Sequence, residues 1–63
     1  MNITEFAALK VGDRISNPFS EASGTVTAVF DTGVSVLWDG SKPDLARHYA
    51  VNSTIWMHWT KSQ

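Results

Sequence analysis

Two short β-type runs joined by a tight turn are the feature that most constrains what this chain can fold into. Residues 25–30 and residues 34–38 are rich in β-branched and aromatic side chains that alternate along each run. Asp-Thr-Gly at 31–33 separates the two runs, and Asp-Gly at 39–40 ends the second. Alternation with a period of two, bounded by Asp and Gly, predicts an antiparallel β-hairpin. The chain is therefore expected to be all-β.

Chain length and composition predict one small domain that spans residues 1–63. A chain of this size buries only about 60% of its extended surface, so its stability is marginal. It has no Cys, which excludes disulfides and thiolate zinc sites, and its two His lack a clustered partner. Stabilisation must come from the large aromatic side chains, and neither a metal nor a cofactor is expected.

The charge balance disfavours a dedicated nucleic-acid binder. Five Lys and Arg against six Asp and Glu give a formal charge of −1, and the basic residues are scattered. No stretch approaches the roughly 18 apolar residues that span a bilayer. The first residues lack the features of a signal peptide, so a cytoplasmic location without a membrane partner is expected.

The pattern along the chain predicts a short helical segment at 3–9, with Thr4 as its cap, and five strands. The first strand follows a turn at 10–15, and an irregular loop covers 17–23. After the hairpin, strands are expected at 45–49 and 54–59, with one helical or 3₁₀ turn at 50–53 between them. Gly33 and Gly40 are expected at backbone angles that favour glycine. The expected core consists of Ile15, Val26, Phe30, Val36, Leu45 and Ile55.

The order of these elements, with residues 11–15 (VGDRI), 24–29 (GTVTAV), 34–40 (VSVLWDG) and 49–51 (YAV), resembles the SH3-like small barrels. The resemblance covers residues 9–59 and includes KOW-type and Tudor-type barrels and small bacterial and phage proteins. It implies a five-stranded SH3-like barrel with a short N-terminal helical turn and a 3₁₀ turn before the last strand. It also implies a non-catalytic binding module that contacts protein or nucleic acid.

An enzymatic alternative comes from a weaker resemblance to type II dihydrofolate reductases, which are small barrels that assemble around a central pore. Arg47-His48-Tyr49 occupies the place of that family's Gln-Ile-Tyr pore segment, and only the Tyr matches. A small oligomeric enzyme of this kind is the second hypothesis. No nucleophile and base stand in a recognised motif, so the sequence assigns no catalytic residue.

The candidate binding residues are the bulky or polar side chains near the C-terminus: Arg47, Tyr49, Trp56 and His58. In a strand at 54–59, Trp56 would lie on the face opposite Trp59. It is then either an exposed contact residue or covered by the N-terminal turn or by a second subunit. A protein partner or self-association is favoured, and nucleic acid is the alternative. A cage of Trp38, Asp39 and Tyr49 around a cationic side chain is a further hypothesis.

Overall fold

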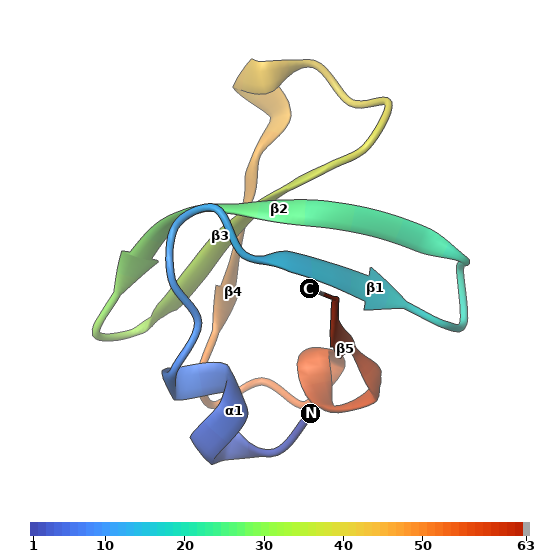
Figure 1. Cartoon of the computed structure of the whole chain (residues 1–63). Coiled ribbons are helices and arrows are strands. Elements are labelled where there is room, and N and C mark those ends of the chain that lie inside the picture. The colour runs from blue at the N-terminus through green and yellow to red at the C-terminus, as the bar shows by residue number, and fades with distance from the viewer. Residues whose placement is uncertain (63) are drawn as a thin grey trace.

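The predicted hairpin is the centre of the structure, a computed structural model that describes residues 1–62. Strand β2 (Ala22–Phe30) pairs with β3 (Gly33–Trp38), and three shorter strands extend the sheet on both sides (Figure 1). All pairs are antiparallel, in the order β4-β3-β2-β1-β5. The shorter strands are β1 (Arg14–Asn17), β4 (Arg47–Ala50) and β5 (Thr60–Ser62). The all-β prediction is confirmed, with one five-stranded sheet whose outer strands β4 and β5 are not paired with each other.

A short helix, α1 (Ile3–Ala7), precedes the sheet and ends two residues earlier than predicted. Its cap is Asn2 rather than Thr4, because the Asn2 side chain accepts the Glu5 backbone N–H at 2.8 Å. The Glu5 carboxylate in turn accepts the Asn2 N–H at 3.0 Å, which completes a capping box. A helix this short is unstable alone, so its contacts with the rest of the chain hold it.

The last third of the chain differs from the prediction. Residues 55–58 form a 3₁₀ helix, η2 (Ile55–His58), where a strand was expected, and the last strand is β5. Nearly every side chain from 55 to 59 is apolar, so periods of two and three fit the pattern equally well. In a 3₁₀ helix, side chains three residues apart lie on one side, which buries Trp56 and Trp59 together and exposes Ile55 and Met57.

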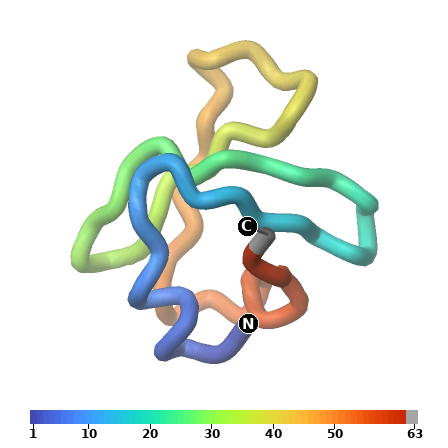
Figure 2. The backbone as a smooth tube through the Cα atoms, viewed as in Figure 1, coloured from blue at the N-terminus to red at the C-terminus, as the bar shows by residue number. Residues whose placement is uncertain are grey.

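A second 3₁₀ helix, η1 (Pro43–Leu45), takes the first residues of the predicted fourth strand. Proline at 43 fixes a turn geometry and cannot donate to a β-ladder, so β4 starts only at Arg47. Residues 39–46 form a loop that projects away from the sheet, at the top of Figures 1 and 2. Leu45 lies in this loop and is exposed, so its predicted place in the core is wrong.

A β-bulge in β2 corrects the prediction for Phe30. Val26 pairs with Val36, but Ala28 pairs with Ser35, so Thr27 is an extra residue in the ladder. Beyond the bulge, Val29 rather than Phe30 continues the inward face, since a one-residue slip reverses every side chain. Phe30 is consequently 52% exposed.

The core lies between the inner face of the sheet, α1 and η2. Three of the six predicted core residues, Ile15, Val26 and Val36, are buried there, whereas Phe30, Leu45 and Ile55 are exposed. The other buried side chains are Phe6, Leu9, Val34, Trp56 and Trp59. The Met1 ammonium group donates to the carbonyl oxygens of Met57 (2.8 Å) and Trp59 (2.9 Å), which ties the start of the chain to η2.

The two turn glycines have the expected positive φ angles, +152° at Gly33 and +87° at Gly40. At Gly33 a second constraint applies, because β4 passes close to the backbone. A Cβ there would lie 2.0 Å from the Tyr49 carbonyl oxygen and 2.9 Å from the Ala50 Cα. A Cβ at Gly40 would meet no atom within 4 Å. Gly33 therefore permits the close packing of β3 against β4.

Candidate functional site

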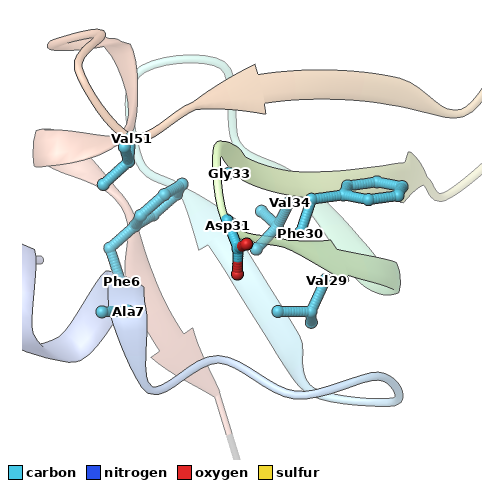
Figure 3. A pocket seen from close by; sticks show the side chains of 8 residues that line it. All are labelled: Phe6, Ala7, Val29, Phe30, Asp31, Gly33, Val34 and Val51. Atoms are coloured by element: carbon cyan, nitrogen blue, oxygen red, sulfur yellow. The ribbon is translucent and has the colours of Figure 1, made fainter.

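A groove of about 290 Å³ lies between α1 and the tip of the β2–β3 hairpin (Figure 3). Most of its lining residues are apolar, and Asp31 is the charged residue among them. The lining residues are Phe6, Ala7, Val29, Phe30, Asp31, Gly33, Val34 and Val51. The groove is the candidate binding site of this chain.

Phe6 connects the groove to the core. Its side chain is almost fully buried and stacks on Trp56, with ring centroids 4.3 Å apart and an angle of 17° between the planes. Opposite, Val29 is 44% exposed although it follows the inward face of β2. The groove therefore combines a fixed aromatic floor with an apolar wall that remains accessible to solvent.

The hairpin tip that carries Asp31 is held in place by the end of β4. The Val51 backbone N–H donates to the Thr32 carbonyl oxygen at 2.8 Å. The Thr32 hydroxyl lies 3.4 Å from Nε2 of His48, and Gly33 packs directly on β4. These contacts fix the backbone at Thr32 and Gly33, so the turn that carries Asp31 is held beside the groove.

The structure does not gather the four predicted binding residues into one patch. Trp56 is 4% exposed and donates its indole N–H to the Ala50 carbonyl oxygen at 3.0 Å. Of the alternatives for Trp56, cover by the N-terminal segment is the one observed. Arg47 is exposed at the start of β4, and His58 is exposed on η2 with its ring 4.7 Å from that of Phe19. The four residues are thus divided between the core and separate parts of the surface.

Tyr49 is half-buried and belongs to an aromatic cluster with Trp38 and Trp59. The Tyr49 hydroxyl accepts the Trp38 indole N–H at 2.7 Å, and all three rings meet nearly at right angles. Trp59 is buried, and its indole nitrogen has no hydrogen-bond partner among residues 1–62. The residue that matches the reductase pore segment therefore has its hydroxyl engaged within the chain.

The predicted aromatic cage is not assembled, because Asp39 is paired elsewhere. The Arg14 guanidinium donates to both carboxylate oxygens of Asp39, at 2.9 and 2.6 Å, and to the Thr25 hydroxyl at 2.7 Å. Trp38 instead borders a second hollow, of about 560 Å³, beside the projecting loop, together with Ser41, Asp44, Leu45, Ala46 and Arg47. Arg47 is the predicted site residue that lines this second hollow.

Two ion-paired carboxylates predict a loss of stability in acid. The hydrogen bonds from Arg14 hold the pKa of Asp39 below its ordinary value of 3.8. The Lys10 backbone N–H, with help from Lys61, likewise lowers the pKa of Asp13. A folded-state pKa below the unfolded one stabilises the fold above the unfolded pKa, and this contribution disappears as pH falls through the folded pKa. Thermal melting should therefore show the midpoint falling from about pH 4 downward.

The Asp39→Asn variant should have a lower melting temperature at neutral pH and a flatter decline in acid. The side chains of Arg14 and Asp39 are both exposed, so the change in melting temperature is small and is reduced further by salt. A pH profile of this variant parallel to that of the wild type would show that the Arg14–Asp39 pair does not contribute.

The groove was not predicted from the sequence, for two reasons. Asp31 was expected only as a turn residue, and unbroken alternation along residues 25–30 puts Val29 on the face opposite Val26, because the bulge at Thr27 leaves no mark in the alternation. The Asp-Thr-Gly turn itself was visible. What was missing was the packing of α1 against η2, which brings Phe6 and Ala7 opposite the hairpin tip.

Comparison with known proteins gives no relative from which a function could be carried over. No protein-family model matches the chain, and no curated protein or solved structure matches it significantly. Within residues 1–62, no three His, Asp or Glu side chains are grouped to hold a metal ion. In the same residues no helix has the length and apolar character needed to cross a membrane.

Proposed function

We propose that this chain is a non-catalytic binding module that docks a segment of a partner protein in the groove between α1 and the β2–β3 hairpin. The observation that carries this proposal is an apolar groove with exposed walls on a fixed frame. Contiguous exposed apolar surface marks contact sites on soluble proteins, whereas single exposed apolar side chains do not. Val29 and Phe30 provide that surface, at 44% and 52% exposure.

The architecture supports an SH3-like small barrel as the scaffold of the module. The strand order β4-β3-β2-β1-β5 and the 3₁₀ helix directly before the last strand agree with the element order of that family. The sheet stays open between β4 and β5, so the barrel assignment belongs to this proposal. Fold alone does not define a function, and the groove supplies the argument.

Groove size favours a side chain of a larger ligand over a cofactor. Pockets for cofactors and drug-sized molecules usually measure about 300–1,000 Å³ and enclose most of the ligand. The groove here, at about 290 Å³, lies at the lower limit and is partly open to solvent. It has room for one anchoring side chain of a chain that continues over the surface.

The charge at the groove favours protein over nucleic acid. Asp31 would repel a phosphate group, and no Lys or Arg is among the lining residues. A protein partner avoids this penalty because its side chains can be apolar or basic. Nucleic-acid binding through another face remains an outcome that the experiment below detects.

Val29→Gln is expected to weaken docking without unfolding the chain. Peptides selected from a random library on the wild-type chain should bind this variant roughly tenfold more weakly, because a half-exposed valine wall is replaced by a polar, uncharged amide. Binding is measured by fluorescence anisotropy. Val11→Gln is the matched control, since Val11 is also exposed but does not line the groove.

Peptides that bind both variants as tightly as the wild type would contradict the proposal. Tight binding of oligonucleotides of random sequence that Val29→Gln left unchanged would also contradict the proposal. Circular dichroism of both variants should match that of the wild type, which separates loss of docking from loss of folding.

A further inference from the structure

We propose that the groove accepts a long basic side chain, arginine or lysine, from an extended segment of the partner protein. This inference rests on the proposed function and names the chemistry of its anchor. The apolar stem of the side chain would lie between Phe6 and Val29, and its cationic end would meet the Asp31 carboxylate.

Asp31 is the first observation. Its side chain is exposed and makes no ion pair or hydrogen bond with any other residue in the part of the chain described, 1–62. Asp39 and Asp13, by contrast, are paired with Arg14 and Lys61. Asp31 is thus a carboxylate that the fold positions beside the groove without using it.

The arrangement of charge and apolar surface is the second observation. In Figure 3 the Asp31 carboxylate lies between Phe6 and Ala7 on one side and Val29 and Phe30 on the other. A single negative group beside an apolar groove complements a cation carried on an apolar stem. Arginine and lysine have this form, since they bury their methylene groups along apolar surface and keep the charged end at its edge. A carboxylate also forms strong, charge-assisted hydrogen bonds with their N–H groups.

The third observation is that no basic side chain among residues 1–61 is paired with Asp31 or lines the groove. The lining residues include no Lys or Arg, so no internal cation neutralises Asp31. The hydrogen bond from Val51 to Thr32 and the close packing of Gly33 on β4 fix the turn before any ligand arrives. A turn whose backbone is already held loses little backbone entropy on binding, which raises affinity.

The experiment uses three capped pentapeptides, Ala-Leu-X-Leu-Ala, in which X is arginine, norleucine or glutamate. Norleucine keeps an unbranched apolar stem and removes the charge. Binding is followed through the backbone amide resonances of the intact chain by NMR at low salt. We expect the arginine peptide to shift the amides of Val29, Asp31 and Val51 and to bind about fivefold more tightly than the norleucine peptide. The glutamate peptide should bind most weakly.

Asp31→Asn is expected to reduce the affinity for the arginine peptide to that for the norleucine peptide and to leave the latter unchanged. Asp44→Asn is the matched control, because Asp44 is an exposed carboxylate on η1 outside the groove. Added salt should remove the advantage of the arginine peptide and spare the norleucine peptide.

Equal affinities for the arginine and norleucine peptides, or an unaffected Asp31→Asn variant, would overturn this inference and leave an apolar docking groove in place. Amide shifts confined to a different surface would overturn it as well. If, in addition, peptides selected on the wild type bound Val29→Gln as tightly as the wild type, the proposed function itself would be contradicted.

Discussion

Gly33→Ala should remove a large part of the free energy of unfolding. The new Cβ would lie 2.0 Å from the Tyr49 carbonyl oxygen, and that atom belongs to the backbone of β4, which cannot turn aside as a side chain would. The β3–β4 ladder must separate locally, and the φ of +152° adds strain for any side chain. We expect a cost of about 4 kcal/mol or more, in the exceptional range for a single substitution. The free energy of unfolding of a whole domain of this size is roughly 3–9 kcal/mol.

Gly40→Ala is the control for Gly33→Ala, because both glycines have positive φ but only one is crowded. A Cβ at Gly40 meets nothing within 4 Å, so only the backbone preference is lost, about 1–2 kcal/mol. Urea denaturation followed by circular dichroism compares the two. Equal losses of unfolding free energy in the two variants would mean that close contact with β4 does not restrict the side chain at position 33.

Trp56→Ala should destabilise the protein about as much as Gly33→Ala, because it removes the aromatic ring against which α1 packs. Trp56 is buried, stacks on Phe6 and donates to the Ala50 carbonyl oxygen. Replacing a buried tryptophan by alanine costs about 3–5 kcal/mol. Since α1 cannot persist without its packing surface, we expect loss of helical signal together with loss of cooperative unfolding.

Two milder variants serve as comparisons for Trp56→Ala: one keeps an aromatic ring at position 56, and the other removes an exposed ring elsewhere. Trp56→Phe keeps an aromatic ring against Phe6 and loses the hydrogen bond to Ala50, with an expected cost of about 1–2 kcal/mol. Phe30→Ala removes an aromatic ring that is half-exposed, with an expected cost below about 1 kcal/mol. A Trp56→Ala protein as stable as Phe30→Ala would contradict the burial of Trp56.

Local chemistry made the hairpin predictable. Residues 25–38 have alternating β-formers and an Asp-Thr-Gly turn, and both signals act between neighbours in the chain. The glycine angles were predictable for the same reason, since a tight turn determines them. Alternation also predicted the burial of Ile15, Val26 and Val36, because the β-ladder is regular at these positions.

The errors arise where tertiary packing overrides a local pattern. At 55–59 an almost continuous apolar run has no single period, and the decision for a 3₁₀ helix comes from burying Trp56 and Trp59 at once. In β2 one extra residue at Thr27 reversed the faces of Val29 and Phe30. The groove depends on both the 3₁₀ helix and the bulge. Neither could be predicted from the local sequence pattern, so the groove could not be predicted either.

The five-residue helix that supplies Phe6 also links any ligand to the integrity of the N-terminal segment. Such a helix exists only while it is docked, so the groove and the docked helix form and disappear together. A ligand that needs the formed groove must then stabilise the docked helix by mass action, by about 1.4 kcal/mol at ten times its dissociation constant. Anything that loosens the first residues of the chain weakens binding to the same extent. Affinity and local order at this end of the molecule are thus two measures of one equilibrium.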